Sequence, residues 1–425
     1  MLGYTGLSAA KTLVENGYDV TVFETTEDVA GVAKCIPCGD TYIEKHYRHI
    51  FKSDSCALKL LNEFGLEDKM QWNETMMAYY SKEGLYGFGT PLTLLTYRPL
   101  NLWQKFLFGL SYLKVKLNKD YKSLENQTAE EWIKKNCGEK IYKKIWEPLL
   151  ITKFGSQKSQ ISMAWLWGKI NLRSSSGTLK GERLGYLTGS YKVFNDALKK
   201  CIEEKGCKIK LNSPVNKVTK QKSKFIVETP AGEEKDFDYV INTVAYEESS
   251  KFLKDLLKKD EIKKMGQLKY TSARTMLLKL KKSFSKFYWM NIGDNDIPFG
   301  GVIEHTNMIN KETYGGDIIL YISNYMFSND KLYNKTKEEL LDVYIPFLQR
   351  INPEFKKEDI IEYEVYDEKY AQPVITTGYS DKKLDIKLKE KNLYMATMAQ
   401  IYPEDRGMNY ALELGEKVAK DIIGE

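Results

Sequence analysis

The first stretch of the chain places its apolar residues with the period of a helix and then with that of a strand. Leu7, Ala10, Leu13 and Val14 recur at helical spacing, which predicts a helix with one apolar stripe. Gly17 follows, at the position where a glycine commonly ends a helix. The next run, DVTVFE, predicts a buried strand that ends in Glu24.

Similar strand and helix signals return near the middle of the chain and again at its end. We find no internal repeat and no low-complexity linker between them. A chain of 425 residues can bury a large core and form more than one lobe. Because the signals do not divide the chain into consecutive domains, we expect lobes built from non-adjacent segments.

Residues 92–117 combine apolar, aromatic and basic side chains in one stretch, LTLLTYRPLNLWQKFLFGLSYLKVKL. Arg98, Pro99, Lys105 and Lys114 interrupt it, so we do not expect it to span a bilayer. A pair of helices that covers a lobe is the favoured interpretation. Peripheral contact with a membrane surface is the alternative.

The composition is that of an ordinary globular protein, with 42% hydrophobic and 29% charged residues. The net charge is +6, but the basic residues are spread along the chain, which argues against a nucleic-acid-binding protein. Six cysteines in so long a chain do not suggest a disulfide framework. We recognise no signal peptide and expect a cytoplasmic enzyme, with membrane association left open.

Gly3 and Gly6 are spaced as the last two glycines of a G-x-G-x-x-G turn, with Met1 where the first glycine would be. Gly3 would let the backbone approach a pyrophosphate, and Gly6 would let the helix pack close to a sheet. The N–H groups near Thr5 to Ser8 would favour phosphates, and Glu24 is placed for a ribose hydroxyl. The alternative is a helix–strand unit that binds nothing.

This fingerprint lacks the strand that should precede Gly3. Either the true chain starts further upstream, or a strand is missing from the fold. In the second case, we expect a central edge of a parallel sheet to be exposed and nucleotide binding to be weakened.

The loop TTEDVAGVAKC, after Glu24, resembles the flavoprotein family that holds amine oxidases, protoporphyrinogen oxidase and UDP-galactopyranose mutase. In that family the loop lies against FAD and ends in a glycine pair and a small residue. This chain has Ala30-Gly31 in place of the pair, followed by Val32 and Ala33.

The resemblance continues over nearly the whole chain, through GYLTGSYKVFNDALKKCIEEKGCKIKLNSPVNKVTKQ and DFDYVINTVA to NLYMATMAQIYPEDRGMNYALELGEKVAKDI. YRHIFKSD, IWEPLLITKFG, ISMAWLWGKINLRS and PFGGVIEHTN resemble a branch often called protoporphyrinogen oxidase-like. Ser190 replaces a usual second glycine after Gly189. A helix that starts near Gly407 would direct its N–H groups at the flavin and stabilise its anionic reduced form.

The resemblance implies FAD as the cofactor, held by residues from the beginning, middle and end of the chain. They are Gly3, Thr5, Gly6, Leu7, Ser8, Glu24, Gly31, Val32, Ala33, Val215, Thr243, Ala245, Arg406, Gly407, Met408 and Asn409. Arg406 could also meet an acidic group of the substrate.

His305 and Lys153 are the candidate catalytic residues. In VIEHTN, Glu304, His305 and Asn307 are predicted on a strand that runs towards the flavin, which makes His305 a candidate acid–base group. Pro148 predicts a turn that brings Glu147 and Lys153 together, as a substrate contact or as a structural ion pair.

His46 and His49 would share one face of a helix, near the flavin or in a structural role. Cys35 and Cys38 form a C-x-x-C pair that could be redox-active, although accidental placement is the favoured interpretation. We expect no metal, because the three histidines and the cysteines show no zinc-type spacing.

Together these patterns predict an α/β flavoprotein of two lobes, with a Rossmann-like FAD domain and a substrate domain of mixed sheet and helices. The predicted ranges are 1–50, 186–260 and 386–425 for the first, and 51–185 and 261–385 for the second. The expected activity is FAD-dependent hydride transfer with a small organic, lipid-linked or sugar-linked substrate, in oxidation or in reduction. The alternatives are a non-redox mutase that acts on a nucleotide sugar and a non-enzymatic remnant.

Overall fold

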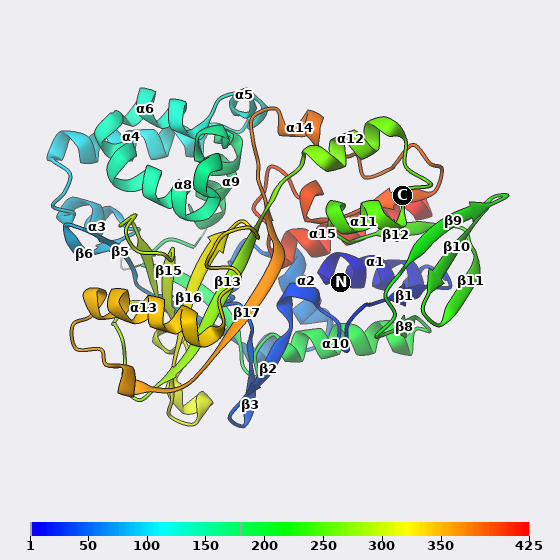
Figure 1. Ribbon diagram of the computed structural model, residues 1–425, viewed down its shortest axis with the longest axis horizontal. Coiled ribbons are helices and arrows are strands. Elements are labelled where there is room, and N and C mark those ends of the chain that lie inside the picture. Colours follow the sequence, from blue (N-terminus) through cyan, green and yellow to red (C-terminus); the bar gives the residue numbers. More distant parts are fainter. Residues whose placement is uncertain (1, 175, 179–180, 425) are drawn as a thin grey trace.

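The computed structural model describes residues 2–174, 176–178 and 181–424. It is an α/β protein in which helices accompany short parallel strands in one lobe and a large mixed sheet in the other (Figure 1). Both ends of the described chain belong to the first lobe, where helix α1 (Tyr4–Glu15) crosses helix α15 (Met408–Ile423). The architecture predicted from the sequence is confirmed.

The first lobe is assembled from distant segments, as the patterns predicted. Its strands are β1 (Thr21–Phe23), β2 (Cys35–Cys38), β3 (Thr41–Glu44), β4 (Met70–Thr75), β7 (Glu182–Leu187), β8 (Lys208–Lys210), β9 (Lys217–Gln221), β10 (Lys224–Thr229), β11 (Gly232–Phe237), β12 (Val240–Asn242) and β18 (Leu393–Met395). Besides α1 and α15, its helices are α2 (Ser55–Glu63), α10 (Lys192–Glu204), α11 (Tyr246–Phe252) and α12 (Lys259–Gln267).

The parallel strands of this lobe form two separate pairs instead of one continuous sheet. Strand β1 pairs in parallel with β8, and β12 pairs in parallel with β18. All three residues of β1 are only half-buried, in contrast to the prediction of a fully buried strand. Strands β1 and β12 each have no paired neighbour on their other edge among the described residues.

Helices α1 and α15 approach each other so closely that a glycine is required between them. A Cβ atom added to Gly415 would lie 2.2 Å from the Thr5 carbonyl oxygen and 2.9 Å from the Ala9 nitrogen. The Ser8 hydroxyl donates a hydrogen bond of 2.7 Å to the Leu412 carbonyl across the same contact. The crossing fixes the start of each helix relative to the other.

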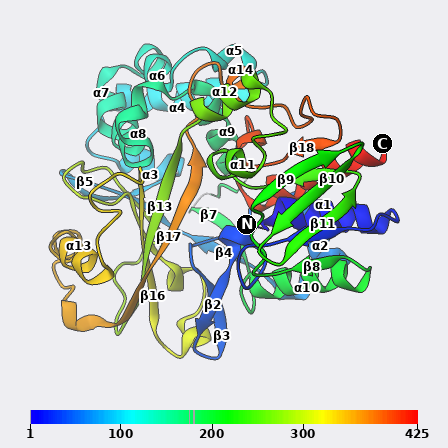
Figure 2. The same ribbon diagram turned by 45° about the vertical axis from the view of Figure 1, so that its right-hand side comes forward.

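The second lobe contains a seven-stranded sheet in the order β17-β13-β16-β15-β14-β5-β6, in which only the β14–β5 pairing is parallel. Figure 2 shows β17, β13 and β16 as long neighbouring ribbons. The strands are β5 (Met77–Ser81), β6 (Gly84–Phe88), β13 (Tyr270–Leu280), β14 (Trp289–Ile292), β15 (Gly301–Glu304), β16 (Ile318–Met326) and β17 (Ile360–Pro373).

The period of two along these strands gives the sheet one packed face and one face towards a cavity. Even-numbered residues such as Met276 and Ile322 pack with Leu341 of helix α13 (Lys337–Ile351). Odd-numbered residues such as Thr275 and Tyr325 line the cavity instead. The sheet therefore acts as the rigid wall of the site.

The remaining helices form a separate cluster over one end of the sheet, built on its own buried core. They are α3 (Pro91–Thr96), α4 (Leu102–Leu117), α5 (Lys122–Glu125), α6 (Ala129–Cys137), α7 (Glu139–Ile141), α8 (Glu147–Phe154), α9 (Met163–Ser174) and α14 (Tyr379–Lys382). None of the helices in the described part of the chain is long and apolar enough to cross a membrane.

The turn predicted at Pro148 is wrong. Pro148 lies at the start of α8, where its missing N–H costs no hydrogen bond. Glu147 and Lys153 then lie on different sides of this helix, and Glu147 forms an ion pair of 2.7 Å with Lys158 instead.

The predicted division into segments stays a prediction, although one helix bears on it. Helix α2, from the range 51–185 assigned to the substrate lobe, packs against α15 of the first lobe. The Asn409 side chain of α15 accepts hydrogen bonds from the backbone N–H groups of Cys56 and Ala57.

We expect Gly415→Ala to lower the free energy of unfolding by about 1–3 kcal/mol, because the added methyl group forces α1 and α15 apart. Gly266→Ala is the matched control, since no atom lies within 4 Å of a Cβ at Gly266 in helix α12. The control should leave stability unchanged or raise it by up to about 1 kcal/mol. Urea unfolding followed by circular dichroism measures both, and equal effects would contradict the close crossing.

Candidate functional site

A cavity of about 2320 Å³ runs between the two lobes and takes in residues from both. Its walls include the open edges of β1 and β12, the starts of α1 and α15, the odd-numbered face of the large sheet, and helices α4, α8 and α9. Such a large, continuous space suits an extended cofactor together with a substrate.

The starts of α1 and α15 both border this cavity and both lack a side-chain cap. Gly3 is the N-cap residue of α1 and Gly407 that of α15, so the helix start predicted at 407–409 is confirmed. The N–H groups of a first helical turn have no partner within the helix and attract negative charge. A Cβ at Gly3 would meet no atom within 4 Å, so the helix start is open to the cavity.

Most of the predicted cofactor residues come together around this space. Gly6 lies behind the helix start, where an added Cβ would be 2.7 Å from Leu2 Cδ1 and 3.5 Å from Thr243 Oγ1. The residues of the predicted set that line the cavity are Gly3, Thr5, Gly6, Gly31, Val32, Val215, Thr243, Ala245, Arg406, Gly407, Met408 and the catalytic candidate Lys153.

The loop at residues 30–33 begins with two residues in the left-handed backbone region. Ala30 has a φ of 76° and Gly31 a φ of 53°, so both lie in the left-handed region, although Ala30 carries a side chain. Ser190 has a φ of 66° and adopts this conformation as well, in the position where a glycine is usual. The left-handed backbone conformation is therefore kept at two positions where this chain has alanine or serine instead of glycine.

Arg48 also lines this part of the cavity, and the sequence did not single it out. One of its Nη atoms donates to the Val32 carbonyl, while its buried Nε has no hydrogen-bond partner among the described residues. The open helix starts and the unpartnered guanidinium nitrogen favour an anionic group, so the described residues fit the pyrophosphate of FAD.

Other predicted cofactor residues lie outside the cavity lining. Leu7 is fully buried in the core, and the Ser8 hydroxyl is used in the contact with α15. Glu24 is fully buried and accepts hydrogen bonds from the backbone N–H groups of Leu2 and Thr26. Ala33 and Asn409 also do not line the cavity. These side chains make structural contacts, and their cofactor roles stay predictions.

His305 does not lie with the other candidates. Strand β15 ends at Glu304, so the prediction of a strand through His305 and Asn307 is wrong, and these residues form a short 3-10 turn. His305 is fully buried and its Nε2 is 2.7 Å from the Tyr314 hydroxyl. It does not border the cavity.

Lys153 lies in a cationic and aromatic group that the sequence revealed only in part. Its Nζ lies 4.9 Å from the ring centre of Tyr325 and 5.6 Å from that of Trp165. Burial and the nearby Lys169 and Arg406 charges hold the pKa of Lys153 well below its usual range. This lowering favours the neutral form of the amine. No sequence motif pointed to Lys169 or Tyr325 as members of this group.

Arg406 and Tyr325 are joined directly in this group. A guanidinium nitrogen of Arg406 donates to the Tyr325 hydroxyl at 2.6 Å, and another donates to the Gln372 side chain at 2.5 Å. Burial raises the pKa of the Tyr325 phenol, but Arg406 and Lys169 outweigh this effect and lower it. Asp405 pairs with Lys169 at 2.6 Å and does not cap α15.

His46 and His49 border the cavity but lie in an irregular segment, so they do not share a helix face. His46 Nδ1 is 2.8 Å from the Thr275 hydroxyl oxygen, and His49 Nδ1 is 3.1 Å from that of Tyr288. Burial lowers the pKa of each histidine to about 3. Both rings are neutral hydrogen-bonding groups near pH 7.

Cys35 and Cys38 occupy the two ends of strand β2. Side chains three residues apart on a strand point to opposite faces, so the two thiols cannot meet. Burial also raises the pKa of both thiols. The geometry therefore overturns the redox interpretation of this pair.

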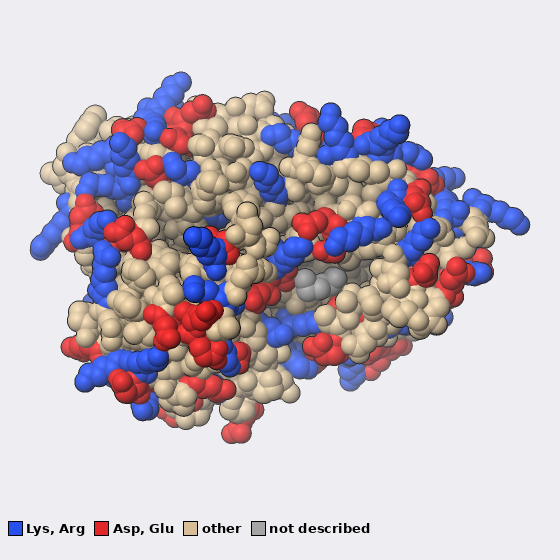
Figure 3. Space-filling model, in the orientation of Figure 1, with Lys and Arg blue, Asp and Glu red and all other residues tan. Residues whose placement is uncertain are grey.

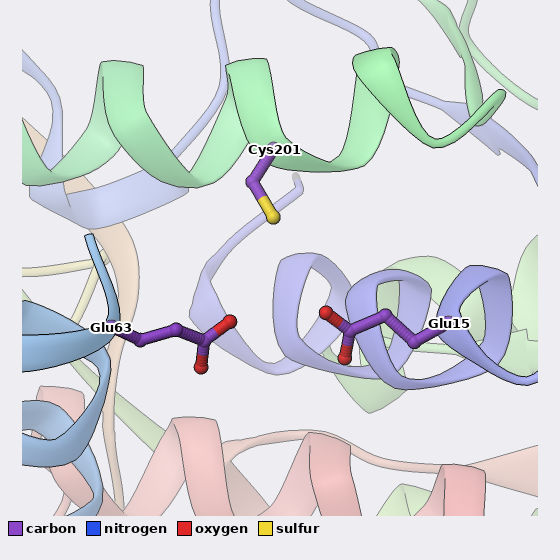
Figure 4. A group of neighbouring side chains, drawn as sticks. All are labelled: Glu15, Glu63 and Cys201. Atoms are coloured by element: carbon purple, nitrogen blue, oxygen red, sulfur yellow. The ribbon is translucent and has the colours of Figure 1, made fainter.

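Among the described residues, Glu15, Glu63 and Cys201 place ligand-type atoms within 4.8 Å of one another (Figure 4). Lys11 already supplies the positive charge there, with its Nζ 2.9 Å from Glu15 and 2.6 Å from Glu63. The group is an ion-pair cluster that joins α1, α2 and α10.

Comparison with known proteins places this geometry in a family. The model of the family described as flavin-containing amine oxidoreductase matches residues 4–423. Amine oxidase [flavin-containing] A of Sus scrofa is 27% identical over 266 residues, which are 57% of this chain and 48% of that protein. The flavin-containing amine oxidase of Oncorhynchus mykiss is 26% identical over 263 residues, 56% of this chain and 48% of that protein. The chain thus spans about half the length of these relatives.

Solved structures share the whole fold. A protoporphyrinogen oxidase candidate from Exiguobacterium sp. 255-15 has a TM-score of 0.79 at 16% identity, covering 100% of this chain and 97% of that one. Cyclohexylamine oxidase from Brevibacterium oxydans IH-35A has a TM-score of 0.71 at 15% identity, covering 99% and 97%. The chain belongs to the flavin-containing amine oxidoreductase family.

Proposed function

We propose that this chain is an FAD-dependent oxidoreductase that oxidises a small organic molecule by hydride transfer to the flavin. The observation that carries the proposal is one continuous cavity with two kinds of lining. Two uncapped helix starts border the cavity in the first lobe. In the second lobe it is bordered by Lys153, which lies among aromatic rings and favours its neutral form. The first lining suits a dinucleotide, and the second suits chemistry on a substrate.

FAD is the cofactor of this family, and when bound it supplies the hydride-accepting chemistry. Gly3, Thr5 and Arg48 would hold its phosphates through backbone N–H groups and a guanidinium. Val215, Thr243 and Ala245 would border its adenosine part. The start of α15 at Met408, with Arg406 before it, would favour negative charge at the reacting end.

Lys153 is the residue that we assign to proton transfer. Its amine lies beside the cavity among Trp165, Tyr325, Lys169 and Arg406. The lowered pKa favours the neutral amine, which can accept a proton from a substrate amine or hydroxyl group. His305 has no comparable access, because it is fully buried and bonded to Tyr314.

For the substrate, we propose a chemical class. Phe106, Leu110 and Leu113 line the outer part of the cavity, which favours an apolar or lipid-linked molecule. A glycan-linked substrate and a cytoplasmic location stay predictions from the sequence. The names of the relatives indicate amine substrates for those proteins. In this chain, the charged side chains of Lys169 and Arg406 lie near Lys153 at the cavity.

The mutase alternative needs arginines that converge on a diphosphate. Besides Arg48, the candidates from the sequence are Arg98, Arg173, Arg183, Arg274 and Arg406, of which Arg173 and Arg406 line the cavity. Arg98 is exposed near α3, and Arg274 is buried against the carbonyl groups of residues 332, 333 and 335. Since the arginines are dispersed, the arrangement favours oxidation over mutase chemistry.

We expect Gly3→Val to weaken FAD binding by about 10- to 100-fold, because the side chain would fill the space that faces the helix start. The backbone at Gly3 is extended and nothing lies within 4 Å, so the apoprotein should stay within about 0.5 kcal/mol of its original stability. Quenching of FAD fluorescence on titration measures the affinity. Gly266→Val, in the open on α12, is the control and should bind FAD normally.

Anaerobic bleaching of the flavin band by candidate substrates tests the activity. We expect Lys153→Met to reduce the rate of bleaching by about 100-fold or more while FAD remains bound, because the proton acceptor is lost. Lys158→Met, which removes the ion pair with Glu147 and a hydrogen bond to the Tyr142 hydroxyl, both outside the cavity lining, should react at nearly the original rate. Failure of the original chain to bind FAD would contradict the proposed function itself.

The same variant tests the electrostatics of Lys153 through stability. Between the lowered pKa of the folded state and the usual value of 10.5, the unfolded chain binds more protons at this site, so stability rises with pH. Lys153→Met should therefore be more stable than the original chain by about 1 kcal/mol near pH 7. The difference should shrink towards pH 10 in urea unfolding, and a constant difference would contradict the lowered pKa.

A further inference from the structure

Helix α4 carries a row of large apolar side chains on its outer surface. Leu102 and Leu117 at its two ends are each 77% exposed, and Trp103 is 64% exposed. Helical spacing aligns them with three further exposed residues between them. This outer stripe consists of Leu102, Trp103, Phe106, Leu110, Leu113 and Leu117. Leu92 and Leu95 of the neighbouring α3 are exposed as well.

The opposite side of α4 packs into the core of the helical cluster. Ser111 and Val115 are buried, and Leu107 and Phe108 pack against the helical core. Helix α4 is thus apolar on both sides, whereas a helix that only covers a core is polar on its outer side. Core packing accounts for the inner side and leaves the outer stripe unexplained.

The charge around the outer stripe has one sign. No Asp or Glu occurs from residue 84 to residue 119, while Arg98, Lys105, Lys114, Lys116 and Lys119 fall within that range. Lys105 and Lys116 lie on one flank of the stripe by helical spacing, and Lys114 lies on the other. On the face shown in Figure 3, by contrast, acidic and basic side chains are interspersed.

We propose that α3 and the outer stripe of α4 dock on the surface of an anionic lipid bilayer. The apolar side chains would enter the interface between headgroups and acyl chains, and the flanking lysines would pair with lipid phosphates and carboxylates. A second copy of the chain fits less well, because a twofold contact would set this basic fringe against itself. In Figure 1, α3 and α4 lie at the end of the molecule away from β9–β11, where no other lobe covers them.

The docking surface is continuous with the cavity. Lys105, Phe106, Leu110 and Leu113 of α4 belong to the cavity lining, and three of them also belong to the outer stripe. A bilayer against α4 would therefore face the cavity mouth, and a substrate dissolved in the lipid could enter without crossing water. This part of the inference rests on the proposed function, because it assigns the substrate to lipid-soluble molecules.

Co-sedimentation of the full chain with vesicles tests the docking. We expect binding to vesicles that contain phosphatidylserine and much weaker binding to pure phosphatidylcholine. Arg98→Gln with Lys116→Gln and Lys119→Gln should lower the partition coefficient by about fivefold per charge removed. Leu102→Ser with Trp103→Ser and Leu117→Ser should lower it by about tenfold or more on the same vesicles. Neither set includes a residue of the cavity lining.

The matched control is Ile262→Ser with Ile361→Ser, which removes exposed apolar side chains from other surfaces. It should bind vesicles like the original chain. Equal binding by the control and by the α4 variants would overturn the proposal, as would equal binding to charged and neutral vesicles. A dimer in analytical ultracentrifugation that only the α4 substitutions disperse would overturn it in favour of a second copy.

Vesicle binding and flavin binding are read separately in these experiments. Failure to bind FAD with normal sedimentation on vesicles would reject the proposed function and leave the docking surface intact. Normal flavin binding without sedimentation on vesicles would reject the docking surface and leave the proposed function intact. Thermal unfolding of every variant shows that the exposed substitutions leave the fold in place, since surface changes normally stay within about 0.5 kcal/mol.

Discussion

The close crossing of α1 and α15 is the constraint on which the site depends. At Gly415 the two helices leave no room for a single carbon atom, and Ser8 bonds across the contact to Leu412. The crossing joins the beginning of the chain to its end, so both uncapped helix starts come to border one cavity. Two positive helix ends near each other would repel, which makes an anionic ligand between them favourable for both.

The large sheet provides the second half of the site because its strands alternate strictly. Met276 and Ile322 hold the sheet on α13, and the residues between such positions must then face the opposite side. Thr275 and Tyr325 reach the cavity for this reason. Tyr325 thus stands on the sheet, whereas Lys153 and Lys169 reach the same cavity from helices α8 and α9.

Local patterns in the sequence predicted the elements and the family, but not which side of an element each residue would use. Apolar spacing and Gly17 predicted the first helix, now α1, and the family resemblance predicted the helix that starts after Gly407, now α15. The Ser8 hydroxyl faces α15, because the distant Gly415 lets that helix approach closely, and no local pattern shows this contact. The grouping of Lys153 with Tyr325 depends on long-range pairing, which no local pattern shows.

Pro148 and Glu24 show two further limits of local reasoning. A proline breaks a helix interior but starts a helix well, and only the position of α8 decides between these effects. Glu24 was assigned from its spacing to Gly6, yet its carboxylate is bonded to the backbone of Leu2 and Thr26. The spacing predicts where Glu24 lies along the chain, but the groups that donate hydrogen bonds to its carboxylate oxygens depend on the folded structure.

Two features that the folded chain disfavours by itself lie at the cavity or beside it. Lys153 is an amine desolvated beside Lys169 and Arg406, and the outer stripe of α4 leaves leucines in water. Neither arrangement stabilises the isolated chain, because a desolvated amine and an exposed apolar row both favour unfolding or association. Their position on one cavity gives each a use, since a lipid surface would cover the stripe and a substrate proton would meet the amine.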